Sequence, residues 1–391
     1  MGEIKVLEGN ETVAYAVKLC RPDVISGYPI TPMSSTWDYL FQFQADGLLN
    51  AEMVAVEGEH SSMSVLIGAA QAGGRTFTAS SSQGLFFMYE AYVSASTLRL
   101  PVVMGIATRE PQSPQGVTAS DQDIIMAKEA GWIQIHVESC QEIMDTIIMA
   151  YRLAEDPEIL VPVNVCYIGF YLTYLLEPVD IPEQEKVDQF LPPLKMSPRL
   201  DPLTPMTGHA YTTEVITTEY RCKHAAAMHR AKAKLDEIDR EFQQAFGRSY
   251  GGQIEEYRCD DADIVLMTMG NCSGTAKVVV DQKRAEGLKV GLVKVRLFRP
   301  FPAERLISAV RGKKAIGVID RNVLFGWNSG GLFVEAKAAL CDLDTPIPMV
   351  NFIDGLSGID ITEDSIARAI SITQSVAEGK PHKRVYWFSL E

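Results

Sequence analysis

The chain has 391 residues, of which 47% are hydrophobic and 22% charged, and 50 acidic residues against 36 lysines and arginines give a formal net charge of −14. This apolar content excludes a disordered chain, and the acidic balance argues against nucleic acid as a partner, because nucleic acid is bound through clustered cations. No apolar run approaches the roughly 20 residues that a membrane-spanning helix needs, so no membrane partner is expected either.

The first 180 or so residues alternate between short apolar runs and segments with helical spacing. Helices are predicted at 59–71 and 141–154, among others. Regular alternation of strand and helix predicts an α/β fold with a parallel sheet covered by helices on both faces. The apolar runs, which are typical of buried parallel strands, lie at 23–26, 75–79, 101–107, 132–137 and 161–165.

A proline-rich and charged stretch follows from about Glu177 to Gly208, and it predicts an extended connector. A helix is predicted next, over 212–246, because apolar residues recur at helical spacing, and Gly247 suits its C-terminal cap. The apolar stripe of this helix consists of Met228, Leu235, Ile238, Phe242 and Ala245.

A second α/β unit is predicted from Asp261 onward, and its pattern is that of a doubly wound domain. We therefore expect a domain at 1–200, a connector with a long helix at 201–258 and a second domain at 259–391. The predicted elements of the second unit are strands at 264–269, 290–295 and 315–319 and helices at 275–286 and 302–309.

Several predicted strand ends carry residues that suit a binding site, and the carboxyl ends of parallel strands are where α/β sheets bind ligands. The turn 27–32 offers the hydroxyl of Thr31, although a helix entry capped by Thr31 or Ser34 explains the same residues. Glu59 begins a predicted helix, where the helix dipole alone also favours a carboxylate.

Two further strand ends extend this edge. The small-residue turn 80–84 contains a glycine that lets a backbone approach a ligand, but it matches neither a GxGxxG nor a Walker loop. Arg109 follows the next strand, and its fork of donors suits a substrate carboxylate, or else it pairs with Glu110 on the surface. Asp121 and Asp123 open the next helix and are predicted to be caps.

The seven cysteines are widely separated, which excludes CxxC pairs, zinc ribbons and ferredoxin-type cluster runs. His224 and His229 are assigned exposed or core roles on a helix, so no metal site is expected in this chain. Scattered cysteines fit a reducing cytoplasm, and the N-terminus MGEIKVLEGN lacks the basic and apolar regions of a signal peptide. We therefore expect a cytoplasmic protein.

Taken together, motifs along nearly the whole chain resemble the α subunit of 2-oxoacid:ferredoxin oxidoreductases, most closely the pyruvate type. The motifs that carry this resemblance are GYPITP at 27–32, VEGEHSSMSVLIGAAQAGGRTFTASSSQG at 56–84, AGWIQ at 130–134, QAFGRSYGG at 244–252, VLMTMGNCSGTAK at 265–277, KVRLFRPFPAERL at 294–306 and VIDRNVLFG at 318–326.

The resemblance implies a fold, an activity and partners. The domain at 1–200 is then similar to the pyrimidine-binding domain of thiamine diphosphate enzymes, and that at 259–391 to the transketolase C-terminal domain. The implied reaction is oxidative decarboxylation of a small 2-oxoacid, with electrons passing to ferredoxin and with coenzyme A as a further candidate substrate. Mg²⁺ and [4Fe–4S] clusters are implied on β-, γ- and δ-type companion subunits, which share the thiamine diphosphate with this chain.

The resemblance also implies roles for single residues. The activating glutamate of the family falls on Glu59, whose carboxyl shares a proton with the pyrimidine ring, and apolar surroundings suit this role by raising a carboxyl pKa. Arg109 matches the arginine that clamps the substrate carboxylate, and Thr31 stands where it touches the substrate or the reactive end of the cofactor. The other residues expected against the cofactor are Pro29, Ile30, Ser82 and Gln83.

One stretch departs from the family pattern. Residues 110–123, EPQSPQGVTASDQD, are more polar than the loop typical of pyruvate enzymes, so Gln112 or Gln115 is expected to meet a second polar group on the substrate. A site built to bind such a group disfavours a methyl ketone, which leaves an oxalate-specific, coenzyme A-independent enzyme as an alternative. A non-redox thiamine decarboxylase and a noncatalytic scaffold subunit are the alternatives from other classes.

Overall fold

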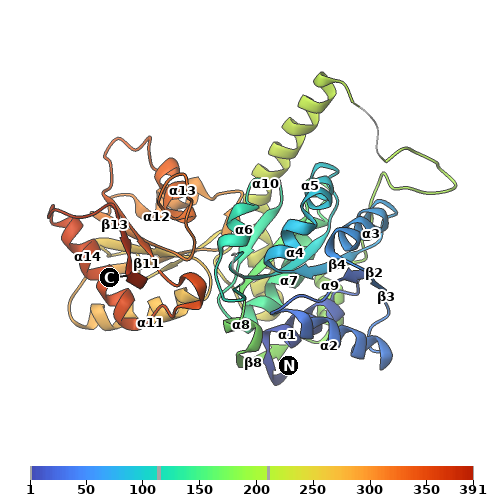
Figure 1. The fold of residues 1–391 in the computed structure, drawn as a ribbon, viewed down its shortest axis with the longest axis horizontal. Helices are drawn as coiled ribbons and strands as arrows, with labels where there is room; N and C mark the ends of the chain where they lie inside the picture. The colour runs from blue at the N-terminus through green and yellow to red at the C-terminus, as the bar shows by residue number, and fades with distance from the viewer. Residues whose placement is uncertain (1, 112–115, 209–211, 391) are drawn as a thin grey trace.

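The computed structural model describes residues 2–111, 116–208 and 212–390. Figure 1 shows two α/β units side by side, with the helix α10 (Glu214–Phe246) rising beyond the first of them. Up to that helix, the elements in chain order are β1 (Glu3–Glu8), α1 (Gly9–Leu19), β2 (Val24–Gly27), α2 (Ser34–Ala45), β3 (Glu52–Ala55), α3 (Glu59–Gln71), β4 (Thr76–Ser80), α4 (Ser82–Phe87), α5 (Tyr89–Thr97), β5 (Val103–Thr108), α6 (Gln122–Met126), β6 (Ile133–His136), α7 (Cys140–Ala154), β7 (Val163–Ile168), α8 (Tyr171–Tyr174), β8 (Leu176–Ile181) and α9 (Gln184–Phe190).

The elements that follow α10 form most of the second unit. They are β9 (Ile254–Tyr257), β10 (Ile264–Thr268), α11 (Cys272–Ala285), β11 (Val290–Val295), β12 (Leu297–Arg299), α12 (Ala303–Val310), β13 (Ala315–Asp320), α13 (Gly331–Ala339), β14 (Met349–Ile353), α14 (Glu363–Ala377) and β15 (Val385–Trp387). No helix within the described ranges is long and apolar enough to cross a bilayer.

The first unit is built around a sheet whose order, in the described part of the chain, is β12-β6-β7-β5-β4-β2-β3. Its neighbours pair in parallel, apart from β12, which is antiparallel to β6. The predicted strands are present, each beginning one or two residues later than expected, and the helix predicted at 59–71 is α3. Every residue of β5 and β7 is buried, as continuous apolar runs predict for strands covered on both faces.

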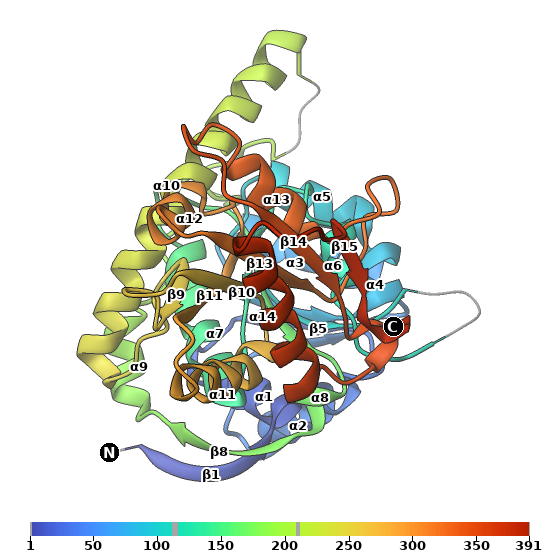
Figure 2. The same ribbon diagram turned by 90° about the vertical axis from the view of Figure 1, so that its left-hand side faces the viewer.

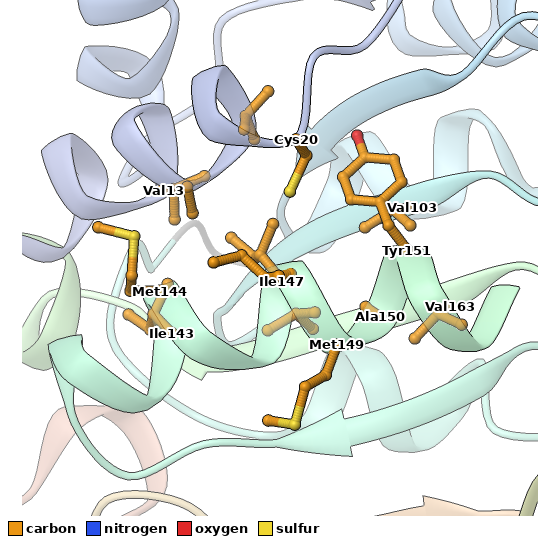
Figure 3. Packing of buried hydrophobic residues seen from close by; sticks show 14 of the residues in the cluster. Val13, Cys20, Val103, Ile143, Met144, Ile147, Met149, Ala150, Tyr151 and Val163 are labelled. Carbon is orange, nitrogen blue, oxygen red and sulfur yellow. The ribbon is translucent and has the colours of Figure 1, made fainter. Parts of the chain in front are cut away.

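The core of this unit lies where α1 and α7 pack on the sheet (Figure 3). Ile143, Ile147 and Ala150 recur at helical spacing along α7 and join Val13 of α1 in one buried cluster. The helix begins at the Ser139 cap, whose hydroxyl accepts the Glu142 N–H at 3.2 Å. Nearly all of α7 is buried, because α1 and α10 pack on the faces that the sheet leaves open.

The segment 177–208, predicted as an extended connector, contains a strand and a helix. β8 pairs antiparallel with β1, with Glu3 opposite Ile181, and α9 buries Val187 in the core of the first unit. The sequence prediction missed β8 and α9 because the prolines and charged residues around them lower the apolar content of this segment. The rest of this segment, all of it described, carries no further helix or strand.

The helix α10 confirms the long helix predicted after this segment. It ends at Gly247, whose φ of 79° is the left-handed conformation of a glycine cap. Leu235, Ile238 and Phe242 are buried against the first unit as predicted, whereas Ala245 is exposed and does not belong to the stripe. The first turns of α10 project beyond the first unit in Figure 1, and residues 214–223 are exposed.

The sheet of the second unit has the order β15-β14-β13-β10-β11-β9 in the described residues, and it lies in front of the first unit in Figure 2. It is parallel apart from β9, which is antiparallel to β11. Strand β11 has the predicted bounds, whereas α11 begins at Cys272, earlier than expected. Directly after β11, the chain enters the first sheet as β12, which pairs with β6. A strand from the second half of the chain thus completes the sheet of the first unit.

A buried cluster of charges joins the two units. Glu142 of α7 accepts hydrogen bonds from Lys294 Nζ at 2.7 Å and from Arg296 Nε at 2.6 Å, and all three side chains are at most 1% exposed. Burial alone would raise the pKa of Glu142, but the two cations hold it below its usual range. A buried carboxylate is tolerated only with such partners, so this cluster fixes how the units meet.

Glu142→Gln tests this role, because it keeps the shape of the side chain but removes the closest of the carboxylates that pair with Lys294 and Arg296. We expect the free energy of unfolding to fall by about 3–5 kcal/mol, measured by urea denaturation at neutral pH. Glu286→Gln is the control, since Glu286 forms an exposed pair with Lys283, and we expect a loss below about 1 kcal/mol there. Equal losses in the two variants would contradict the assignment.

Candidate active site

The predicted site residues gather at the carboxyl ends of neighbouring strands. Because β5, β4 and β2 are adjacent in the first sheet, the loops that follow them meet at one edge. These loops carry Arg109, Ser82 and Thr31 respectively, and α3, which begins at Glu59, follows the neighbouring strand β3. The convergence that the sequence predicted is therefore present in the fold.

Glu59 is the first residue of α3, and its side chain is buried, with a residue exposure of 6%. No ion pair or side-chain hydrogen bond holds this carboxyl among the described residues. Burial is the main influence, and it raises the pKa of Glu59 above its usual range. Burial therefore favours the protonated form of the Glu59 carboxyl over the ionised form more strongly than water does.

The wall beside Glu59 is formed by β4 and the start of α4. A Cβ atom on Gly84 would lie 2.4 Å from Glu59 Oε1 and 2.4 Å from Ser80 Oγ, so only glycine leaves room for the carboxyl. The hydroxyls of Ser80 and Ser81 are buried without a hydrogen-bond partner among the described residues. Unpaired buried hydroxyls next to an acid are polar groups that a polar ligand can satisfy.

Arg109 follows β5 and is 8% exposed. Its Nη1 donates to the backbone oxygen of Thr31 at 2.8 Å, so the arginine joins the loops after β5 and β2. Its Nε is buried without a partner in the described residues, and burial lowers the pKa of the guanidinium, which nevertheless stays charged. The surface pair with Glu110, the alternative interpretation, is not among the ion pairs of the described residues.

Of the two acidic residues predicted to be caps, Asp121 stands at the N-cap position of α6, whereas Asp123 lies inside the helix and has another role. Asp121 stands at the N-cap of α6 without a side-chain capping bond and instead accepts the Thr108 hydroxyl at 3.0 Å. Asp123 is fully buried and accepts backbone N–H groups from two other loops. Local sequence gave no sign of this, because the donors lie on different strand ends.

The remaining predicted residues differ in accessibility. Thr31, Pro29 and Gln83 are exposed, Ile30 is half-buried, and Ser82 is buried with a φ of 44°. Gln112 and Gln115, predicted to contact the substrate, lie outside the described residues.

The second unit supports this edge from the side, which sequence reasoning missed. Gln122 exchanges two hydrogen bonds with the backbone of Val323, at 3.0 and 2.8 Å, and the Ser120 hydroxyl donates to the backbone oxygen of Arg321 at 3.0 Å. The motif VIDRNVLFG at 318–326 includes Arg321 and Val323, but its pattern alone does not indicate these contacts. These contacts fix the start of α6 next to the site.

The described residues include no group of three or more His, Cys, Asp or Glu side chains placed to hold a metal ion. All seven cysteines are free thiols in the structure. His224 is largely buried on α10, where its Nε2 lies 2.8 Å from the backbone oxygen of Gly131, a core role as predicted.

A parallel α/β sheet with a buried acid and an arginine at its carboxyl edge, joined to a doubly wound unit, is the arrangement that the resemblance to thiamine diphosphate enzymes predicts. The comparisons with known proteins agree. Residues 15–240 match the family described as pyruvate flavodoxin/ferredoxin oxidoreductase, thiamine diphosphate-binding, and residues 262–366 match the pyruvate:ferredoxin oxidoreductase core domain II.

The chain is also similar to whole subunits from other organisms. It is 44% identical over 374 residues to the pyruvate synthase subunit PorA of Methanosarcina barkeri, covering 95% of this chain and 93% of that protein. It is 42% identical over 388 residues to the alpha subunit of NADH-dependent phenylglyoxylate dehydrogenase of Aromatoleum evansii, covering 96% and 92%. The solved 2-oxoglutarate:ferredoxin oxidoreductase of Magnetococcus marinus shares the fold, with a TM-score of 0.73 at 19% identity over 95% of this chain and 65% of that chain.

The chain therefore belongs to the 2-oxoacid:ferredoxin oxidoreductase family, as a thiamine-diphosphate-dependent α subunit. The resemblance and the fold class expected from the sequence are confirmed. The alternatives of a non-redox decarboxylase and a noncatalytic scaffold find no support among these relatives.

Gly84→Ala tests whether the space beside Glu59 matters. The new methyl group would push the carboxyl away from its place, and we expect kcat/KM to fall by about 10²-fold while the complex still assembles. Gly274→Ala on α11 is the control, because a Cβ there meets no atom within 4 Å. A Gly84→Ala complex with activity within about twofold of the wild type would contradict this geometry.

Proposed function

We propose that this chain supplies the acid and the arginine of an active site that it shares with a companion subunit. The observation that carries the proposal is the buried carboxyl of Glu59, which has no side-chain partner among the described residues and lies against Gly84, where no side chain stands in its way. Burial raises the pKa of this carboxyl above its usual range, which favours the protonated form that can share a proton with a ring nitrogen.

The residues around Glu59 fit the pyrimidine end of thiamine diphosphate. Gly84 leaves room for the Glu59 carboxyl, and the hydroxyls of Ser80 and Ser81, unpaired among the described residues, are polar atoms that can face a polar ring. When bound, thiamine diphosphate supplies the carbon that adds to the substrate carbonyl and stabilises the negative charge left by decarboxylation. Pro29, Ile30, Ser82 and Gln83 are the further residues of this chain that we propose to contact the cofactor.

Arg109 is proposed to bind the carboxylate of the substrate. Its Nη1 bond to the backbone of Thr31 fixes the direction of the guanidinium, while its Nε remains without a partner in the described residues. A fixed, planar fork of donors binds a carboxylate with two parallel hydrogen bonds, which orients the substrate for reaction. Thr31, exposed beside it, is proposed to touch the substrate or the cofactor.

The partners follow from family membership. We propose that Mg²⁺ and the [4Fe–4S] clusters lie on β-, γ- and δ-type subunits, and that electrons pass through them to ferredoxin. Coenzyme A is a further candidate, since the Magnetococcus marinus enzyme was solved with it bound. We also retain the domain division at 200 and 258 and a cytoplasmic location as proposals, the latter supported by the seven free thiols.

The proposed substrate is a small 2-oxoacid, with pyruvate the first candidate because a relative of 44% identity is a pyruvate synthase subunit. Oxalate is the second candidate, favoured by the polar sequence around Gln112 and Gln115. A panel of pyruvate, oxalate, 2-oxoglutarate and branched 2-oxoacids, each with and without coenzyme A, separates them through reduction of a low-potential dye. Activity with oxalate alone, without coenzyme A, would decide against pyruvate.

Glu59→Ala tests the role of the acid in the assembled complex. Because the variant removes the buried carboxyl itself, we expect turnover to fall by at least about 10²–10⁴-fold, the usual contribution of a positioned acid or base. Glu57→Ala is the control, since Glu57 is exposed and bonded to Ser61. Near-normal turnover by an assembled Glu59→Ala complex would overturn the assigned role.

A further inference from the structure

Asp123 is a buried carboxylate that none of the proposed catalytic roles uses. We propose that it is a positioning residue, which sets the distance between the acid and the arginine of the site. This inference rests on the proposed roles of Glu59 and Arg109.

The geometry of Asp123 ties two loops to one oxygen atom. Its Oδ2 accepts the backbone N–H of Ser82 at 2.9 Å and the backbone N–H of Arg109 at 3.0 Å. Its Oδ1 accepts the N–H of Ile124 at 2.8 Å, which fixes the carboxylate on its own helix. The side chain is 0% exposed, so water does not compete for these bonds.

One of these bonds controls the wall beside Glu59. Ser82 has a φ of 44°, a conformation that residues other than glycine rarely adopt, and it begins α4. Gly84, two residues further on, is the residue whose missing Cβ leaves room for the Glu59 carboxyl. Releasing the Ser82 N–H therefore frees the backbone that shapes the space around the acid.

The other bond controls the arginine. Asp123 accepts the backbone N–H of Arg109, and the side chain of Arg109 donates through Nη1 to the backbone oxygen of Thr31. Strands β4 and β5 pair in parallel, with Ser80 opposite Ile106, so the loops that leave them lie within reach of one acceptor. A single carboxylate thus links the acid end of the site to its arginine end.

A carboxylate suits this place better than an amide. Burial raises the pKa of Asp123, whereas the N–H groups of Ser82, Arg109 and Ile124 favour its ionised form, which accepts hydrogen bonds at both oxygens. Asparagine has one acceptor oxygen, so its NH₂ group must face either the two loops or the N–H of Ile124. The variant Asp123→Asn therefore keeps the volume of the side chain and breaks part of this connection.

The experiment compares the full complexes of wild type and Asp123→Asn under the assay for 2-oxoacid oxidation. We expect kcat to fall and the KM for the 2-oxoacid to rise, with kcat/KM lower by about 10–100-fold, while subunit content and bound thiamine diphosphate stay unchanged. Asp23→Asn is the control, because Asp23 lies just before β2, at the opposite edge of the first sheet, and its carboxylate accepts the backbone N–H of Arg75 at 2.7 Å. We expect its kinetic constants to stay within about twofold of the wild type.

A double variant separates positioning from a general loss of stability. If Asp123 acts through Arg109, the rise in KM caused by Asp123→Asn should shrink to below about twofold in the Arg109→Lys background. The same factor in both backgrounds would overturn the proposal, and so would wild-type constants in Asp123→Asn.

Failure of both Asp123→Asn and Asp123→Glu to assemble would assign Asp123 to folding and overturn the proposal as well. A wild-type complex inactive with every 2-oxoacid would overturn the proposed function and this inference together. An active wild type with an unaffected Asp123→Asn variant would overturn the inference alone.

Discussion

The ion pairs of Glu142 with Lys294 and Arg296 hold the two α/β units in one arrangement. All three side chains are buried, and a buried charge without its partner costs several kcal/mol, so other ways of packing the units are disfavoured. The same stretch of chain, just after Arg296, enters the first sheet as β12. The buried ion pairs and strand β12 therefore stabilise the same contact between the two units.

This junction brings the second unit next to the active edge of the first. The contacts of Ser120 and Gln122 with the backbone at Arg321 and Val323 fix the beginning of α6, and that helix carries Asp123. Because Asp123 accepts hydrogen bonds from Ser82 and Arg109, the position of the second unit affects the loops that carry these two residues. The doubly wound unit thus supports a site to which it contributes no proposed catalytic side chain.

Much of the fold was predictable because it depends on local pattern. Continuous apolar runs predicted the parallel strands, and the placement of Thr31, Glu59 and Arg109 at strand ends predicted that they would meet. The prediction failed where contacts between distant segments decide the structure. β8 forms because its backbone pairs with β1, which lies far away in the sequence. Asp123 accepts hydrogen bonds from two loops whose proximity the hydrophobic pattern does not indicate.

The central claim is that the carboxyl of Glu59 faces the pyrimidine ring of thiamine diphosphate in a site completed by a companion subunit. A structure of the assembled complex with thiamine diphosphate bound tests it most directly. The claim predicts a Glu59 carboxyl oxygen at hydrogen-bond distance, about 2.6–3.2 Å, from a ring nitrogen of the aminopyrimidine. A cofactor bound with its pyrimidine ring away from Glu59, or wholly within another subunit, would contradict it.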